Sequence, residues 1–279
     1  MPLYSVVKER TFDRVPNVNR NSWLTVTALA VLSILTFAGC YQPTSPPQLI
    51  TEPPPAPSPA ALLTQHRIIG TSVRGRPLMC TVLGQGQDVA FILATIHGNE
   101  PAGTPLVRRL AEYLQQRPNL LRGRKVVLLP IANPDGMAMG TRSNAHGVDL
   151  NRNFRTANRI NSPQFGRRAL SESEAQAIER VIRQYAPDRI VSVHQPLTCI
   201  DYDGPAAALA DRMAQYCDLP VRKLGAKPGS LGSYAGLTLA IPIITFELPR
   251  NANRLNQQAL WERYGTALIA AVVYPDTVR

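Results

Sequence analysis

Val89-Ala-Phe-Ile-Leu-Ala-Thr-Ile96 is a continuous apolar run, and His97-Gly98-Asn99-Glu100 follows it directly. A run of this kind indicates a strand that is buried on both faces, as in the centre of a parallel sheet. In α/β folds, ligands bind where the chain leaves the carboxyl ends of such strands. The stretch therefore predicts an α/β domain with a functional site just after a central strand.

The sequence on either side of this stretch alternates between strand and helix patterns. Ser171-Glu-Ser-Glu174 has the form of a capping box that opens a helix. Alternation of this kind predicts helices on both faces of a mixed sheet. The other predicted strands are 77–83, 125–131, 189–193 and 242–246, and the predicted helices are 102–116, 171–185, 206–216 and 256–272.

His97 and Glu100 are candidate metal ligands, because a spacing of three residues lets an imidazole nitrogen and a carboxylate oxygen meet on one ion. His194 stands at the end of the strand 190–193, in the equivalent place of the pattern. A catalytic zinc site has three protein ligands and one open position for water, so these residues predict such a site. Taken singly, His-x-x-Glu also fits a capped helix start, and a histidine at a strand end often has a structural role.

Glu247 ends a third apolar strand, in Ile241-Pro-Ile-Ile-Thr-Phe-Glu-Leu-Pro249. An unpaired carboxylate is costly at such a position. Beside a metal it becomes useful, because it can take a proton from water and later pass it to a leaving amine. The alternative is an ion pair with Arg250 or Arg254.

The irregular segment before Leu170 gathers hydrogen-bond donors in Asn133-Pro-Asp-Gly136, Arg142 and Gly147-Val-Asp-Leu-Asn-Arg152. The planar guanidinium of Arg152, with Asn151 beside it, suits a carboxylate. Arg142 suits the oxyanion of a tetrahedral intermediate. The alternatives are an ordinary turn at Asn-Pro-Asp-Gly and solvated arginines in a loop.

Taken in order, these motifs resemble those of the zinc carboxypeptidases related to carboxypeptidase A, over residues 66–279. The resemblance implies a three-layer α/β/α sandwich on a mixed, mainly eight-stranded sheet, with one zinc ion per chain. It also implies a role for each matching residue: zinc ligand for His97, Glu100 and His194, general base for Glu247, oxyanion binding for Arg142, and binding of the substrate's terminal carboxylate for Asn151 and Arg152.

Two further segments, 193–205 and 229–235, resemble the bacterial murein peptide amidases more than the digestive enzymes. Those amidases hydrolyse the γ-D-glutamyl to meso-diaminopimelate bond of cell-wall peptides, so we expect a murein-derived peptide substrate. Tyr234 is a candidate for the family's active-site tyrosine, with core packing as the alternative. Asp201 and Asp203 are candidates for binding the ammonium of the diaminopimelate side chain, although Asp203-Gly204 also fits an ordinary turn.

The first 65 residues have the pattern of an export signal followed by a spacer. Residues 24–39 carry no charge, follow several basic residues and end at Phe37-Ala38-Gly39-Cys40, which resembles a lipobox. We expect a lipoprotein signal peptide at 1–39, lipid attachment at Cys40 and a Pro-rich linker at 40–65, with an uncleaved anchor as the alternative. The catalytic domain, 66–279, would then be exported and held at a membrane, on its periplasmic or cell-surface side.

The composition adds weaker constraints on partners. The net charge of +11 favours anionic surfaces or acidic substrates, or belongs simply to a solvated, Arg-rich surface. Nothing in the sequence resembles a nucleic-acid-binding motif, which argues against nucleic acid as a partner. Once Cys40 is lipidated, Cys199 and Cys217 are a candidate disulfide, with buried free thiols as the alternative, and Cys80 is left over.

Two other functions fit parts of the pattern. Deacylases of N-acyl amino acids, of the aspartoacylase and succinylglutamate-desuccinylase group, share His-Gly-Asn-Glu and Asp-Leu-Asn-Arg with this chain. Export and the Asn133-Pro-Asp-Gly136 motif argue against that function. A wall-binding lipoprotein without catalysis could use the same fold, but the complete set of ligands and base argues against it.

Overall fold

The computed structural model describes residues 64–276, which form one seven-stranded sheet with the order β1-β2-β4-β3-β5-β7-β6. The predicted signal peptide and Cys40 lie outside these residues, as does most of the predicted linker. Thr64 and Gln65, the last two residues assigned to the linker, open strand β1 instead. The strands are β1 (Thr64–Thr71), β2 (Pro77–Leu83), β3 (Asp88–Ala94), β4 (Arg124–Leu129), β5 (Arg189–His194), β6 (Leu197–Asp203) and β7 (Ile243–Pro249).

The sheet is mixed, with a parallel centre and antiparallel edges. Strands β4, β3, β5 and β7 run parallel to one another, whereas β2 and β6 pair antiparallel with β4 and β7, and β1 pairs antiparallel with β2. This confirms the predicted mixed sheet. Its size differs from the resemblance, because the described residues contain seven strands and not eight.

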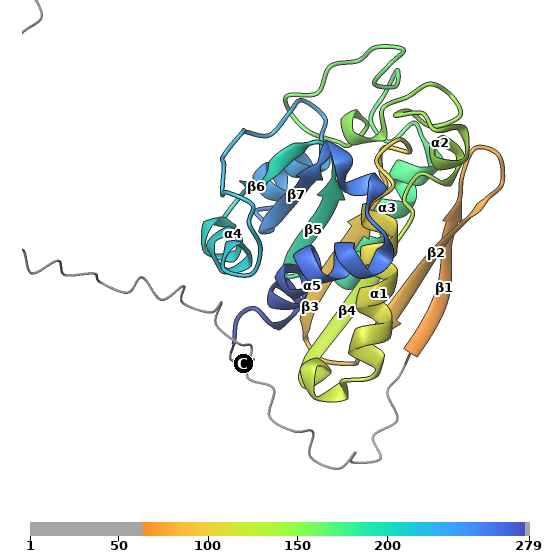
Figure 1. The fold of residues 1–279 in the computed structure, drawn as a ribbon. Coiled ribbons are helices and arrows are strands. Elements are labelled where there is room, and N and C mark those ends of the chain that lie inside the picture. The colour runs from red at the N-terminus through yellow and green to blue at the C-terminus, as the bar shows by residue number, and fades with distance from the viewer. Residues whose placement is uncertain (1–63, 277–279) are drawn as a thin grey trace, which may run out of the picture. The chain divides into compact units, whose positions relative to one another are not determined.

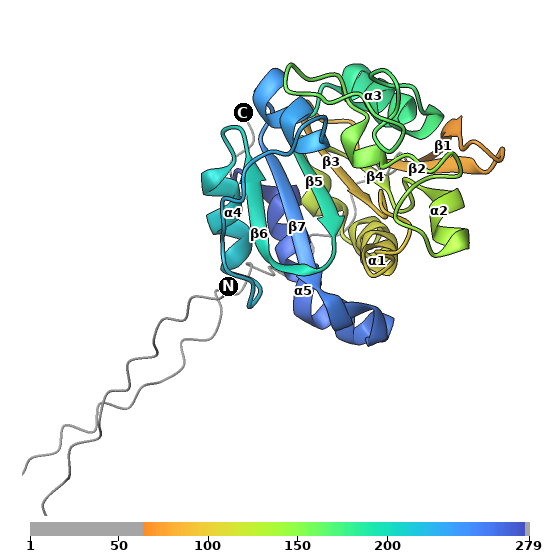
Figure 2. The ribbon, with the colours of Figure 1, turned by 90° about the horizontal axis from the view of Figure 1, so that it is seen from above.

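Helices cover both faces of the sheet, as predicted for a three-layer sandwich (Figure 1 and Figure 2). Side chains of β3 alternate between the two layers: Ile92 packs in the core under α1, α4 and α5, whereas Phe91 packs in the core under α3. Burial of a large apolar side chain stabilises the fold by about 1.5–3 kcal/mol. The helices are α1 (Gly103–Gln115), α2 (Pro134–Met139), α3 (Ser173–Tyr185), α4 (Ala207–Ala214) and α5 (Gln257–Val273).

The edge strands β1 and β6 were not predicted from the sequence. Both mix polar and apolar residues, because an edge strand has fewer neighbours and buries less of its surface. The predicted strands and helices at 77–83, 102–116, 206–216 and 256–272 agree with the structure to within two residues at each end.

The predicted capping box does not form at the start of α3. The N-cap residue is Glu172, and its side chain does not cap the helix. Ser171 Oγ instead donates to Glu172 Oε1, and Glu174 accepts from Asn144 Nδ2 at 3.2 Å. Glu174 therefore links the irregular segment, through Asn144, to helix α3.

The described cysteines are unpaired, and the candidate disulfide between Cys199 and Cys217 is wrong. Cys80 and Cys199 are buried thiols, which was the alternative. Among the described residues, no helix has both the length and the apolar character needed to span a membrane.

Candidate active site

His97, Glu100 and His194 meet at the carboxyl edge of the parallel strands. Ala94 is opposite Val193 in the pairing of β3 with β5, so the chain segments that follow these strands leave the sheet side by side. Single ligand atoms of the three side chains all lie within 4.8 Å of one another, and all three residues are buried. The sequence prediction that these residues converge is thus met by the structure.

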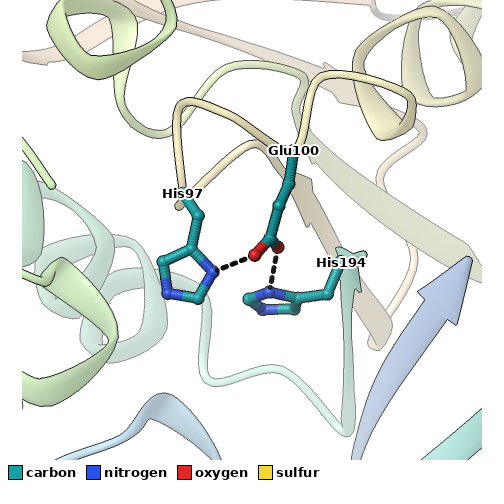
Figure 3. A group of neighbouring side chains, drawn as sticks. All are labelled: His97, Glu100 and His194. Atoms are coloured by element: carbon teal, nitrogen blue, oxygen red, sulfur yellow. Dashed lines mark hydrogen bonds and ion pairs between the residues drawn. The ribbon is translucent and has the colours of Figure 1, made fainter. Parts of the chain in front are cut away.

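Each histidine turns Nδ1 toward Glu100, as Figure 3 shows. His97 Nδ1 lies 3.0 Å from Glu100 Oε1, and His194 Nδ1 lies 2.9 Å from Oε2. His97 Nδ1 is buried and forms no hydrogen bond of good geometry, despite its closeness to the carboxylate. A buried nitrogen without a hydrogen bond needs an explanation, and a bound cation provides one.

The other nitrogen of each ring is held by a protein partner. His97 Nε2 donates to Asp149 Oδ1 at 3.0 Å, and His194 Nε2 lies 2.9 Å from Ser192 Oγ. Such partners orient metal-binding imidazoles and select which nitrogen is free to bind. Asp149 lies inside the quoted Gly147–Arg152 motif, but its role was not predicted. The presence of a carboxylate within that motif is the signal that could have indicated this role for Asp149.

Charge at the three residues suits a cation. Burial alone would raise the pKa of Glu100, but its hydrogen bond with His194 and its close contact with His97 hold that pKa well below its ordinary value. Burial opposes the charged form of His97, yet its hydrogen bond to Asp149 and its contact with the Glu100 carboxylate raise its pKa. Glu100 is therefore ionised, and its negative charge between the two imidazoles favours a bound cation.

Glu247 lies beside this group. His194 and Glu247 are paired across β5 and β7, which puts both residues at the same height on the sheet edge. Glu247 Oε2 accepts a hydrogen bond from Leu197 N at 3.1 Å. Burial raises the pKa of Glu247, an effect that the nearby His194 opposes. The Glu247 carboxylate thus lines the cleft beside the candidate metal ligands, which is the position expected of a general base.

A cleft of about 200 Å³ joins these residues to most of the predicted substrate-binding residues. Arg142, Asn151, Arg152, Asp201 and Asp203 all line it. Its wall also contains residues for which the sequence predicted no individual role, among them Gln195, Leu197, Leu224, Lys227, Ser230 and Thr245.

The donor groups at one end of the cleft are positioned by the protein itself. Asn151 Oδ1 accepts from Leu231 N at 2.8 Å, which leaves its amide NH₂ free to donate. Arg152 Nη1 donates to Asn151 O at 2.6 Å. Arg142 Nη1 lies 3.1 Å from Glu100 Oε1 and its Nε lies 2.9 Å from Asp149 Oδ2. Two guanidinium groups and one amide NH₂ therefore lie together at this end of the cleft.

The structure does not bring Tyr234 to the cleft. Its ring stacks on Phe154 at a centroid distance of 5.8 Å, and its hydroxyl lies 3.4 Å from Glu179 Oε1 on α3. It lines a separate cavity of about 810 Å³. Packing, the alternative for this residue, is what the structure shows.

The sequence model for zinc carboxypeptidases matches residues 61–204, which is just over half of the chain.

The chain belongs to the zinc carboxypeptidase family.

Among curated relatives, murein peptide amidase A of Escherichia coli K12 is 37% identical over 205 residues, covering 67% of this chain and 81% of the relative. The enzyme of the same name from Vibrio campbellii is 31% identical over 209 residues, covering 68% and 82%.

Solved structures give the same relationship. A murein-tripeptide amidase from Escherichia coli O157 has a TM-score of 0.56 at 30% identity, covering 76% of this chain and 92% of that one. Carboxypeptidase A from Helicoverpa armigera has a TM-score of 0.63 at 19% identity, covering 77% and 70%, which shows a shared fold.

Zinc is the cofactor of this family, and the donor set of this zinc carboxypeptidase fits it. Two imidazole nitrogens and one carboxylate converge, and the Nε2 atoms of the two rings contact Asp149 and Ser192. The adjoining cleft leaves room for a fourth ligand. The protein is thus a zinc-dependent hydrolase that acts on peptides.

Proposed function

We propose that this zinc carboxypeptidase releases the C-terminal residue of short murein peptides by hydrolysing the γ-D-glutamyl to meso-diaminopimelate bond. The proposal rests on one cleft, which is lined by the three candidate metal ligands and by Glu247. The same cleft is lined by the hydrogen-bond donors Arg142, Asn151 and Arg152. The relatives that match most of this chain are called murein peptide amidases, which supports the substrate class.

We assign the zinc ion to His97, Glu100 and His194. When bound there, zinc acts as a Lewis acid that polarises the scissile carbonyl and acidifies water. Asp149 and Ser192 hold Nε2 of the two rings, which leaves each Nδ1 directed toward Glu100 and available to bind the metal.

Glu247 is the proton carrier in this proposal. Its carboxylate takes a proton from water as the oxygen adds to the carbonyl carbon, and delivers that proton to the amine as the C–N bond breaks. Burial raises the pKa of Glu247 and so increases its affinity for the transferred proton. The backbone N–H of Leu197 fixes the position of Glu247 Oε2 through a hydrogen bond of 3.1 Å.

The arginines and Asn151 bind negative charge. The free amide of Asn151 and the guanidinium of Arg152 receive the terminal carboxylate of the peptide, which makes the enzyme read a chain end. Arg142 stabilises the oxyanion of the tetrahedral intermediate, since it lies against Glu100 at the edge of the zinc site.

The proposed location is outside the cytoplasm, on a membrane anchored through Cys40. It is supported by the uncharged run at 24–39 and by the sequence Phe37-Ala38-Gly39-Cys40. Labelling with a radioactive fatty acid, compared between the native chain and Cys40→Ala, tests this part of the proposal. Equal labelling of both chains would rule out the anchor.

The substrate is tested by incubating the full chain, in detergent, with L-Ala-γ-D-Glu-meso-diaminopimelate and identifying the products by mass spectrometry. We expect free diaminopimelate and the dipeptide, and we expect a chelator to stop the reaction until zinc is restored. Cleavage of N-acetyl-aspartate in place of the tripeptide would support the deacylase. Binding of the tripeptide without cleavage, by a protein free of zinc, would support the wall-binding lipoprotein.

A further inference from the structure

Asp203 is a buried carboxylate that faces the cleft without a cation beside it. It ends strand β6, is 4% exposed and lines the cleft. Among residues 64–276 no Lys, Arg or His nitrogen lies within 4.0 Å of its oxygens. Burial, helped by the neighbouring charge of Asp201, raises its pKa to about 6. A carboxylate in this position favours a ligand that brings a positive charge.

Asp201, on the same strand, contacts the wall of the cleft. Its Oδ1 accepts a hydrogen bond of 2.7 Å from the backbone N–H of Leu224. Leu224 begins the stretch 224–227, which has no regular secondary structure and forms one wall of the cleft. Asp201 therefore anchors this wall to the sheet.

The same stretch carries Lys227 into the cleft. Its main-chain carbonyl accepts hydrogen bonds from Ser230 N at 3.0 Å and from Ser233 Oγ at 2.8 Å. The far end of the wall is thus also fixed. Within residues 64–276, no carboxylate lies within 4.0 Å of the Lys227 ammonium. Its charge nevertheless lowers the pKa of Asp201, and together with the charge of Lys223 it lowers the pKa of Asp203.

This end of the cleft adjoins the groups assigned to the substrate's terminal carboxylate. Phe154 N donates to Gly229 O at 3.0 Å, and Leu231 N donates to Asn151 Oδ1 at 2.8 Å. The segment that follows Lys227 is therefore packed against residues 151–154. A side chain of the C-terminal, leaving residue would extend toward Asp203 and Lys227.

We infer that Asp203 and Lys227 together bind a zwitterionic α-amino-acid group at the end of the leaving residue's side chain. Asp203 accepts hydrogen bonds from its ammonium, and Lys227 donates to its carboxylate. Asp201 is a positioning residue that holds the stretch 224–227, which revises the expectation that both aspartates bind the ammonium. The inference rests on the proposed function, and it explains how diaminopimelate is told apart from lysine.

The chemical difference between those two residues makes the inference testable. The side chain of meso-diaminopimelate ends in an ammonium and a carboxylate on one carbon, whereas that of lysine ends in an ammonium alone. A carboxylate in the cleft without its partner at Lys227 would lose a charge-assisted hydrogen bond. Lys227 should therefore matter for one substrate only, and Asp203 for both.

The experiment compares kcat/KM on L-Ala-γ-D-Glu-meso-diaminopimelate and on the same peptide ending in L-lysine. We expect Lys227→Met to lower kcat/KM on the first peptide about tenfold, mainly through KM, and on the second less than about twofold. Lys125→Met is the matched control: it removes the same charge from a lysine on strand β4 that does not line the cleft. It should affect neither peptide selectively.

Asp203→Asn should lower kcat/KM on both peptides. Asp201→Asn keeps an oxygen that can accept from Leu224 N, so it should retain activity, whereas Asp201→Ala should raise KM on the diaminopimelate peptide. An equal effect of Lys227→Met on both peptides, or a loss in Asp201→Asn as large as in Asp201→Ala, would overturn the inference.

Calorimetry separates this inference from the proposed function. Free meso-diaminopimelate and L-lysine are titrated into the zinc-loaded full chain and into Lys227→Met. We expect the native chain to prefer diaminopimelate and the variant to lose that preference, whichever bond the enzyme cuts. Failure to cleave the tripeptide would overturn the proposed function, and equal binding of the two amino acids would overturn the inference alone.

Discussion

Nε2 of His97 and Oδ1 of Asp149 are joined by a buried hydrogen bond of 3.0 Å. The same carboxylate accepts from Arg142 Nε and from Asn151 N, both at 2.9 Å. One aspartate therefore orients a zinc ligand and also holds the two residues assigned to the oxyanion and the terminal carboxylate. Loss of Asp149 would therefore weaken both metal binding and substrate binding.

Asp149→Ala tests the first of these effects. Without an acceptor for Nε2, the His97 ring loses its fixed orientation, and we expect the affinity for zinc to fall by about 10- to 100-fold. Competition with a chromophoric chelator measures the change. Asp149→Asn, which keeps one acceptor oxygen, should fall less than Asp149→Ala. Equal zinc affinity in all three proteins would show that this bond has no influence on the metal.

Glu247→Gln separates proton transfer from metal binding. Glutamine keeps the shape of the side chain and an acceptor for Leu197 N, but it cannot take a proton from water. We expect kcat/KM to fall by about 10²- to 10⁴-fold while zinc stays at one per chain. Activity assays paired with metal analysis measure both. Full activity with zinc bound would contradict the assignment of the base.

Arg152→Met tests the reading of a chain end. The guanidinium and its neighbour Asn151 are assigned to the terminal carboxylate, so the variant should lose about 10- to 100-fold in kcat/KM on a peptide with a free C-terminus. A peptide amidated at its C-terminus should be cut poorly by both proteins, with little further loss in the variant. The same loss on both peptides would assign Arg152 to another part of the substrate.

Gly98→Ala tests the turn between the first two ligands. A Cβ at this position would overlap the backbone of Gly136, so the turn or the adjoining helix α2 has to shift. We expect a loss of about 1–3 kcal/mol in the free energy of unfolding and weaker zinc binding, measured by denaturant titration with and without the metal. Asn99→Ala, a change at the exposed next residue, is the control and should leave both quantities unchanged.

The pH dependence of stability tests the environment of Asp203. Burial, together with Asp201, raises its pKa from the ordinary 3.8 to about 6. The unfolded chain ionises this acid more readily, so the ionised form destabilises the fold: the cost is absent below about pH 4, grows up to about pH 6 and is complete above it.

Asp203→Asn removes that cost. The variant should have a higher Tm than the native chain at pH 8, with a difference that disappears as the pH falls toward 4. Thermal melts over this range measure it. Asp211→Asn, at an exposed position, removes a charge elsewhere and should not reproduce the effect. A difference that grows as the pH falls would contradict the raised pKa.

Much of the fold was predictable because the central strands are buried on both faces. The apolar runs of β3, β5 and β7 need no knowledge of their neighbours to be recognised. The edge strand β6 was not predictable in this way, since Leu197-Thr-Cys-Ile-Asp-Tyr-Asp203 alternates polar and apolar residues only in part. Its pairing with β7 depends on the folded structure.

The residues of the candidate site likewise fall into a group that the sequence predicted and a group that it did not. His97, His194 and Glu247 were found because parallel strands bring their carboxyl ends to one edge. Lys227 was missed because it lies in a stretch without periodicity, whose place is set by the contacts of Asp201 and Ser230. Tyr234 was a candidate through the family resemblance alone, and the sequence does not predict which way a π-helical turn points its ring.

The pairing of His194 with Glu247 across β5 and β7 has a consequence for when the enzyme becomes active. The first zinc ligand and the base are 150 residues apart in the sequence, and only the assembled centre of the sheet holds them together. No fragment that lacks β7 contains the base. During synthesis, the emerging chain therefore carries no hydrolytic activity until nearly its whole length has folded.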